Sequence, residues 1–138
     1  MLKWAYKHKI GRVMEKFTNV FRALSDKTRL RILHLLTFSK KELCICEIMD
    51  SLKLAQYNIS KHIRELKLTG LVKERKEGRF VFYSSVKHKD SFSKNIVKSV
   101  ESIDNPVFLD DNSRLKKRLF LRKNDKPAGF ICISKRCR

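Results

Sequence analysis

Two cysteines one residue apart, Cys44 and Cys46, are the residues of this chain best suited to hold a soft ion. Thiolate sulfur prefers Zn(II), Cd(II), Pb(II) or As(III) to Mg(II) and Ca(II). Positions i and i+2 of a regular helix are about 200° apart, so the thiols of such a pair point to opposite sides. Two sulfurs that bind one ion must lie within roughly 4 Å of each other. The spacing therefore predicts a site that forms only where the first helical turn is missing or distorted, and that strains the helix when an ion binds.

The stretch from Glu42 to Gly70 predicts two short helices joined by a turn, which is a helix-turn-helix. We expect Glu42 to open the first helix, because an acidic side chain is stabilised at a helix N-terminus. The packing positions of this first helix are Ile45, Ile48, Met49 and Leu52. A turn at residues 53–55 leads to a second helix from about Gln56 to Thr69, which Gly70 ends. The packing positions of the second helix are Ile59, Ile63, Leu66 and Leu68.

The opposite side of the second helix carries polar and basic residues suited to reading DNA. Amide, hydroxyl and cationic groups hydrogen-bond to base edges in the major groove, and the N-terminal end of such a helix usually enters that groove. The residues that we predict to contact DNA here are Gln56, Tyr57, Asn58, Ser60, Lys61 and Arg64. Lys67, near the end of the helix, is expected to meet a phosphate.

The chain changes period between Leu71 and Ser85, where β-branched and aromatic residues follow a turn at Glu77-Gly78. This pattern predicts a two-stranded β-hairpin. The basic residues nearest its tip are Arg75, Lys76 and Arg79. Such cations contact the DNA backbone or enter a minor groove, so we predict that the hairpin is a DNA-binding wing.

Helical patterns flank this unit on both sides. Apolar residues recur at helical spacing over 14–24, and the Ser-Asp pair at 25–26 supplies an N-cap for an apolar helix over 27–38. A further helix is predicted over 91–103. The chain is therefore predicted to be mainly α with a small β-hairpin, in a winged helix-turn-helix fold. The first and last of these helices each need a partner for their apolar stripe, which favours a homodimer built from both.

The sequence divides into three parts. Residues 1–13 form a basic N-terminal extension, which is either a basic arm or a stretch that precedes a functional chain starting at Met14. Residues 14–103 form a winged helix-turn-helix domain for DNA binding and dimerisation. Residues 104–138 form a basic tail that carries Cys132 and Cys137, and we expect this tail to be mobile or weakly structured.

The charge of the chain limits its partners. Lys and Arg total 33 against 14 Asp and Glu, which gives a formal charge of +19 at pH 7. Such an excess favours a polyanion, and double-stranded operator DNA fits the predicted fold. No apolar run approaches the ~18 residues that span a bilayer, and the N-terminus lacks a signal-peptide core. We therefore expect a cytoplasmic protein with reduced thiols, no membrane partner and no small organic substrate.

Several stretches resemble the ArsR family of metal- and metalloid-responsive repressors. The segment 42–48, Glu-Leu-Cys-Ile-Cys-Glu-Ile, is similar to the metal-box motif of that family, and 23–33 is similar to its second-helix signature. Further matches lie at 59–63, 70–72 and 75–79. The resemblance covers about residues 14–85. It implies a homodimeric winged-helix repressor of the arsenic type, which leaves its operator when As(III), or else Sb(III), Cd(II), Pb(II) or Zn(II), binds the two cysteines.

The chain departs from the family pattern at several positions. Arsenic repressors with a compact site carry a third cysteine five residues after the first, where this chain has Met49. The N-terminal arm lacks the cysteines of cadmium and lead sensors, and His88 with Asp90 does not supply the last-helix site of zinc sensors. Ala55 stands where a capping Ser is usual, which weakens that helix start by ~1 kcal/mol.

The predicted ion site is incomplete within its own stretch. Because As(III) favours three thiolates, Cys132 or Cys137 can complete the site, from the same or a partner subunit. A second hypothesis is a thiol-redox switch, in which Cys44 or Cys46 pairs with one of these tail cysteines. An enzyme is not expected, because the four histidines are scattered along the chain and no nucleophile or phosphate-loop motif is found.

Overall fold

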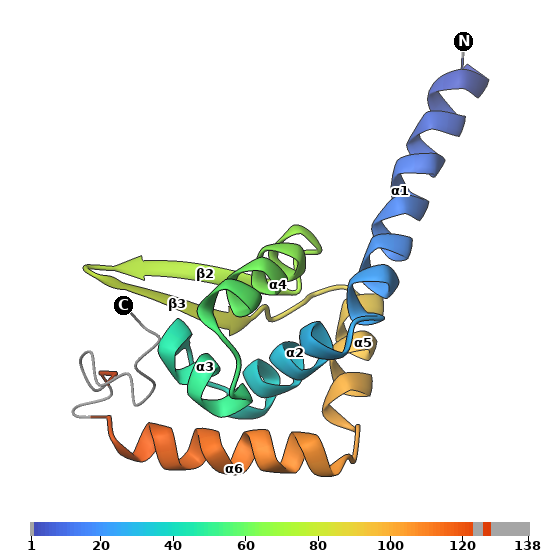
Figure 1. Ribbon diagram of the computed structural model, residues 1–138. Coiled ribbons are helices and arrows are strands. Elements are labelled where there is room, and N and C mark those ends of the chain that lie inside the picture. Colours follow the sequence, from blue (N-terminus) through green and yellow to red (C-terminus); the bar gives the residue numbers. More distant parts are fainter. Residues whose placement is uncertain (1, 123–125, 128–138) are drawn as a thin grey trace.

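The computed structural model describes residues 2–122 together with Lys126 and Pro127. Its elements, in chain order, are α1 (Leu2–Leu24), α2 (Lys27–Ser39), β1 (Leu43–Cys44), α3 (Ile45–Leu52), α4 (Gln56–Leu68), β2 (Val72–Glu77), β3 (Phe80–Ser85), α5 (Ser91–Glu101) and α6 (Pro106–Phe120). The predicted fold, mainly α with a small β element in a winged helix-turn-helix arrangement, is confirmed (Figure 1). No helix within these described residues is long and apolar enough to cross a membrane.

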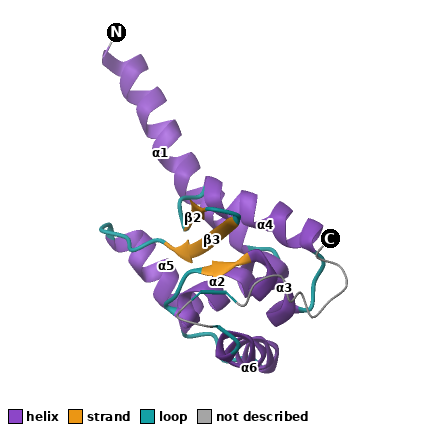
Figure 2. Ribbon diagram, turned by 90° about the vertical axis from the view of Figure 1, so that its left-hand side faces the viewer, coloured by secondary structure: helices purple, strands orange, loops and turns teal. Residues whose placement is uncertain are grey.

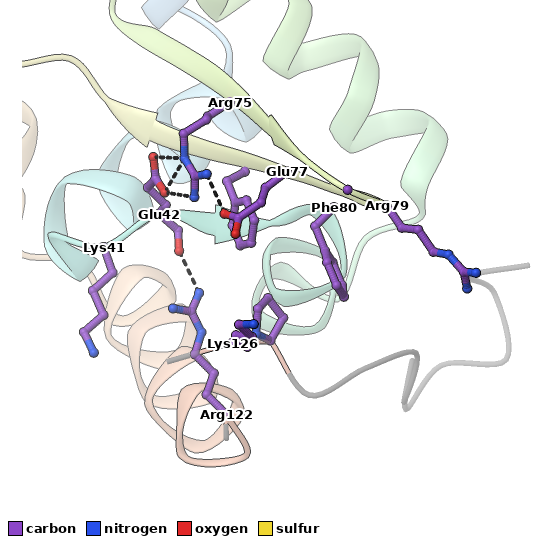
Figure 3. Close-up of a pocket in the computed structure, with 11 residues that line it drawn as sticks. Lys41, Glu42, Arg75, Glu77, Arg79, Phe80, Arg122 and Lys126 are labelled. Atoms are coloured by element: carbon purple, nitrogen blue, oxygen red, sulfur yellow. Dashed lines mark hydrogen bonds and ion pairs between the residues drawn. The ribbon is translucent and has the colours of Figure 1, made fainter. Parts of the chain in front are cut away.

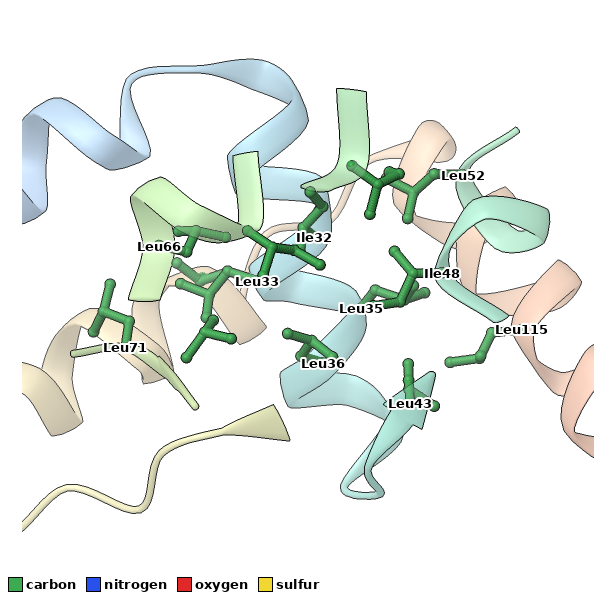
Figure 4. Close-up of a cluster of buried hydrophobic side chains, with 14 of the residues drawn as sticks. Ile32, Leu33, Leu35, Leu36, Leu43, Ile48, Leu52, Leu66, Leu71 and Leu115 are labelled. Atoms are coloured by element: carbon green, nitrogen blue, oxygen red, sulfur yellow. The ribbon is translucent and has the colours of Figure 1, made fainter. Parts of the chain in front are cut away.

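Helix α2 forms the centre of the core. The carboxylate of Asp26 accepts a hydrogen bond from the backbone N–H of Arg29 at 3.0 Å, which confirms the predicted N-cap. Four aliphatic side chains of this helix are at most 1% exposed and pack among α3, α4 and α6 (Figure 4): Ile32, Leu33, Leu35 and Leu36. Burying each such side chain stabilises the fold by about 1.5–3 kcal/mol. Helix α2 therefore fixes the positions of the two helices that follow it.

The predicted hairpin is present as β2 and β3, which pair antiparallel and are joined at Gly78 and Arg79. Gly78 has a φ of +58°, a left-handed conformation that glycine adopts without strain. Strand β1 pairs with the other side of β3, giving a three-stranded sheet in which Cys44 lies opposite Phe82. The sequence does not predict this extra strand, which holds Leu43 and Cys44 extended ahead of α3.

Helix α1 is longer than predicted. The helix expected from Met14 begins at Leu2, so the basic N-terminal residues continue it. Phe17 and Phe21 contact the ring of Phe92 on α5 edge-on, with centroid distances of 4.7 and 5.7 Å. These contacts attach the C-terminal part of α1 to α5, while its N-terminal part projects from the rest of the molecule (Figures 1 and 2).

The expectation that the chain is weakly structured after residue 104 is wrong for residues 106–120, which form α6. The side chain of Asn105 caps this helix by accepting from the backbone N–H of Val107 at 2.9 Å, and Pro106 occupies its first turn. The buried face of α6 alternates apolar and polar residues, namely Phe108, Asp111, Asn112, Leu115 and Arg118. A search for apolar periodicity misses such a face, because Asp111 and Arg118 are polar residues buried through ion pairs.

Candidate functional site

Helix α4 exposes the residues predicted to read DNA. Ile59, Ile63 and Leu66 are at most 2% exposed, which confirms the packing side. On the opposite side the exposed residues are Gln56, Tyr57, Asn58, Lys61 and Arg64, and the half-buried ones are Ser60 and Lys67. Leu68, which was expected to pack, is instead 79% exposed. It lies nine residues after Ile59, and nine steps of a helix place it about 180° away from the core.

A three-residue turn connects α3 to α4. Lys53 adopts a left-handed φ of 56°, and its backbone N–H donates to the carbonyl of Met49 where α3 ends. Ala55 is the N-cap of α4 and offers no side-chain acceptor, as its identity predicts. Because the connection is so short, it keeps the start of α4 next to the end of α3.

Arg75, one of the predicted DNA contacts on the wing, is bound by two carboxylates. Arg75 donates to both carboxylate oxygens of Glu42, the shortest distance being 2.6 Å, and to Glu77 at 2.6 Å. Its guanidinium also lies over the ring of Phe82, 4.9 Å from the centroid. These bonds lower the pKa of Glu42. A DNA contact by Arg75 therefore requires exposed ion pairs to open, each of which contributes little to stability.

Other cations of this surface differ in their availability. Lys67 forms an ion pair with Glu74 at the start of the wing, with a nitrogen–oxygen distance of 2.8 Å. Lys76 and Arg79 are exposed near the tip of the hairpin. The wing therefore presents Lys76 and Arg79 to a polyanion most directly.

Cys44 and Cys46 lie on either side of the start of α3. Cys44 ends β1 and is the N-cap of α3, with φ −79° and ψ 163°, whereas Cys46 lies in the first helical turn. The expectation that Glu42 opens this helix is wrong, because pairing with β3 keeps residues 43–44 extended and α3 begins at Ile45. Cys44 is therefore outside the regular helix, which is the condition that the i, i+2 spacing sets for the two thiols to converge.

Burial favours the protonated form of both thiols. It raises the pKa of Cys44 to about 12, and the negative charge of Glu47 adds to this effect. Burial also raises the pKa of Cys46, while the charge of Arg118 opposes the shift. Since thiolates are the metal ligands, a thiophilic ion that binds here must displace the thiol protons.

The ligand set is not complete among the described residues. In that part of the chain no group of three or more His, Cys, Asp or Glu side chains is arranged to hold a metal ion. The predicted further ligands, Cys132 and Cys137, lie outside it. Cys44 and Cys46 are thus the two predicted ligands whose surroundings can be described, Cys44 being buried and Cys46 half-buried.

Sequence reasoning missed the arginines that join α6 to α3. Arg118 donates to Asp50 at 2.8 Å, and Arg122 donates to both carboxylate oxygens of Glu47, each at 2.7 Å. Glu47 is 0% exposed, and its carboxylate also accepts from the backbone N–H of Cys44 at 3.0 Å. The C-terminal helix is therefore bonded to the same turn that carries the thiols.

A signal for these contacts is present in the sequence. Arginines at 114, 118 and 122 recur every four residues, so their side chains share one side of a helix. Arg114 also reaches α3, because it donates to the backbone carbonyl of Ser51 at 2.5 Å. A regular series of arginines after a helix cap thus indicates an ion-paired helix face as well as a basic tail.

A cavity of about 480 Å³ lies between the wing and the end of α6 (Figure 3). Its lining includes Phe80 and Phe82 of β3 together with Arg122, Lys126 and Pro127. Lys126 and Pro127, which follow α6, thus line the same cavity as β3, the strand that pairs with β1 and its Cys44.

Comparison with known proteins agrees with this geometry. The family model for bacterial regulatory proteins of the arsR family matches residues 26–74. The chain is 44% identical over 89 residues to an uncharacterised HTH-type transcriptional regulator of Methanocaldococcus jannaschii, covering 64% of this chain and 96% of that protein. It is 43% identical over 65 residues to the arsenic resistance transcriptional regulator ArsR2 of Pseudomonas putida, covering 47% of this chain and 56% of that one.

The chain is also similar to a cadmium regulator and to a solved structure. A cadmium resistance regulatory protein CadC homolog of Staphylococcus aureus is 43% identical over 65 residues, 47% of this chain and 53% of its own length. The chain thus spans about half the length of the arsenic and cadmium regulators. The solved structure of reduced HlyU from Vibrio cholerae has a TM-score of 0.55 and 28% identity, covering 67% of this chain and 92% of that one. These matches, together with the winged helix-turn-helix fold, show that the chain belongs to the ArsR family of helix-turn-helix transcriptional regulators.

Proposed function

We propose that this ArsR-family repressor binds operator DNA as a homodimer and releases it when a thiophilic ion binds Cys44 and Cys46. As(III) is the inducer that we propose first, ahead of Sb(III), Cd(II), Pb(II) and Zn(II). The observation that carries the proposal is the position of the two thiols across the start of α3, the helix joined to α4 by a three-residue turn. An ion that binds both sulfurs acts on the N-cap and the first turn of α3, and we propose that α4 then moves with α3.

The binding of DNA is proposed for α4 and the wing. Gln56 and Asn58 lie at the exposed N-terminal end of α4, where side chains reach base edges in the major groove. Lys76 and Arg79 are placed to meet the backbone from the wing. Because the cations neutralise phosphates, we expect affinity to fall steeply with salt.

The third thiolate is proposed to come from the tail of the same subunit. Arg122 donates to the backbone carbonyl of Glu42 at 2.6 Å, so α6 ends beside the segment with Cys44 and Cys46. Ten residues of sequence separate Arg122 from Cys132 and fifteen separate it from Cys137. The shorter connection favours Cys132 over Cys137.

The homodimer is proposed from an exposed apolar face on α1. Ile10, Val13, Met14 and Phe21 are between 45% and 58% exposed, and their spacing places them on one side of the helix. A second copy of the chain would cover this face together with α5. Sedimentation that shows only monomer at micromolar concentration would count against the dimer.

The function is tested by DNA release. An operator duplex is first selected from a randomised pool with the purified protein. Its complex is then titrated with As(III), Sb(III), Cd(II), Pb(II) and Zn(II), for the native chain and for Cys44→Ser, Cys46→Ser, Cys132→Ser and Cys137→Ser. Release by at least one ion, lost in Cys44→Ser and Cys46→Ser, supports the proposal. Release by none of the ions overturns it.

A thiol-redox switch is the second candidate. One observation favours it, namely that a matched structure is described as reduced HlyU, so a redox state is specified for that protein. Formation of a disulfide from Cys44 or Cys46 and a tail cysteine needs a two-electron oxidant such as a peroxide, and removes two hydrogens from the chain. A mass loss of about 2 Da under mild peroxide, with DNA release and no effect of thiophilic ions, would select this candidate.

A further inference from the structure

Arg122 bridges both ends of the segment that holds the two cysteines. One guanidinium nitrogen donates to the backbone carbonyl of Glu42 at 2.6 Å and to the carboxylate of Glu47 at 2.7 Å. A second nitrogen donates to the other carboxylate oxygen at 2.7 Å. Residues 42 and 47 flank Cys44 and Cys46, so a single side chain of the C-terminal region closes this segment.

Glu47 extends the bridge to the cap of α3. Its carboxylate accepts from the backbone N–H of Cys44 at 3.0 Å, and its backbone carbonyl accepts from the hydroxyl of Ser51 at 2.6 Å. The side chain of Glu47 is 0% exposed and that of Arg122 is 8% exposed. Charge-assisted bonds in so buried a place are strong and directional. They hold Cys44 at the N-cap position.

Arg118 secures the next part of the same helix. It donates to Asp50 at 2.8 Å, its side chain is 3% exposed, and its charge acts on Cys46. The two arginines thus bind acids three residues apart on α3, one in its first turn and one in its second.

We infer that Arg122 and Arg118 are positioning residues of the sensor, which hold the thiol-bearing turn of α3 in its ion-free form and thereby set the ion concentration needed to release DNA. The inference rests on the proposed function and assigns a role to α6 within it. In this inference, an ion that binds both sulfurs moves Cys44 relative to Cys46. That movement draws the N–H of Cys44 away from Glu47, which Arg122 keeps in place.

Arg122→Lys separates this role from simple charge. A lysine keeps the positive charge beside Glu47, so no buried carboxylate is left without a counter-ion, but a single ammonium cannot reproduce the two-nitrogen fork that holds both carboxylate oxygens of Glu47. Arg118→Lys applies the same logic at Asp50. Lys117→Arg, an exchange of the same two residue types at an exposed position of α6, is the matched control.

The measurements are the As(III) concentration that releases half of a labelled operator, and the affinity for As(III) of the DNA-free protein from the ultraviolet absorbance of arsenic–thiolate bonds. Arg122→Lys is expected to lower the half-releasing As(III) concentration and the dissociation constant for As(III) at least about fivefold each. A fivefold change lies at the small end of usual coupling energies. Arg118→Lys should lower them less, and Lys117→Arg should leave them unchanged. Circular dichroism checks that each variant is folded.

The outcomes separate this inference from the function on which it rests. If the native chain releases DNA with As(III) and both arginine variants need the same concentration as the native chain, the positioning role is wrong while the function stands. A raised concentration in Arg122→Lys, which would mean that Arg122 favours the ion-bound form, overturns it equally. If no thiophilic ion releases the native chain, the proposed function and this role fall together.

Discussion

Arg122 and Glu47 form a bidentate ion pair whose carboxylate is 0% exposed, with both nitrogen–oxygen distances at 2.7 Å. Removing one partner of such a pair leaves an uncompensated charge in the interior. Arg122→Gln is therefore expected to lower the free energy of unfolding by about 3–5 kcal/mol. The double variant Glu47→Gln with Arg122→Gln should lose clearly less free energy of unfolding than Arg122→Gln alone. Urea denaturation compares them, and equal losses in the two variants would contradict a buried ion pair.

Residues on α4 and on the wing should contribute to DNA binding in different ways. Asn58→Ala removes a proposed base contact, so it should weaken binding to the selected operator by about 1–3 kcal/mol and leave non-specific binding unchanged. Arg79→Ala removes a backbone contact, so it should weaken both and reduce the slope of log affinity against log salt by about one. Titrations at several salt concentrations measure both effects.

Glu65→Gln serves as the control for these DNA measurements, because Glu65 is exposed on α4 and is not among the predicted contacts. It should not lower the affinity for the operator. If Asn58→Ala and Arg79→Ala behave alike on specific and random DNA, the assignment of α4 to base reading is wrong.

The thiols should make both stability and ion binding depend on pH. The pKa of Cys44 is raised from 9.0 to about 12, so the folded state holds its proton over a range in which the unfolded state loses it. This stabilisation is complete below pH 9 and is lost as pH rises towards 12. Between pH 9 and 12 the free energy of unfolding of the native chain should decline, and the decline should be smaller in Cys44→Ser. Identical declines in the two proteins would contradict the raised pKa of Cys44.

The same raised pKa has a consequence for the ion. Near pH 7 each thiol that binds a divalent cation such as Cd(II) must release a proton, so the apparent affinity for Cd(II) should rise with pH, by up to tenfold per unit for each proton released. Cd(II) titrations at pH 6, 7 and 8 test this with the DNA-free protein. An affinity for Cd(II) that does not change with pH would mean that the buried thiols are not its ligands.

Ala55 offers a test of the recognition helix that leaves its DNA-facing residues unchanged. As the N-cap of α4 it provides no side-chain acceptor, whereas a serine hydroxyl can accept from the free N–H groups of the first turn. Ala55→Ser should raise the free energy of unfolding by about 1 kcal/mol, measured by urea denaturation. Ala55→Val, which adds volume without an acceptor, is the control and should give no such gain.

The helix-turn-helix follows from the sequence because its apolar residues repeat at helical spacing and its caps are local. Asp26 and the packing residues of α4 could be identified in this way, apart from Leu68, which lies too far around the helix. Strand β1 could not, since its pairing with β3 joins residues about forty positions apart and depends on tertiary contacts rather than on local propensity. It displaced the start of α3 from Glu42 to Ile45.

Helix α6 shows the same limit for charged residues. Arg118 and Arg122 look like part of a basic tail in the sequence, because their charge is visible there and their acidic partners on α3 are not near in the chain. Arg75 shows the opposite error, because a cation that seems available to DNA is bound by Glu42 and Glu77. Long-range ion pairs decide which cations remain available, and composition does not reveal them.

Ion-dependent release of DNA is tested most directly by the anisotropy of a labelled operator bound to the native chain and titrated with As(III), with Cys44→Ser in parallel. We expect the native complex to dissociate and the Cys44→Ser complex to stay bound over the same range. Dissociation of both complexes at the same concentration, or of neither with any thiophilic ion, would contradict this expectation.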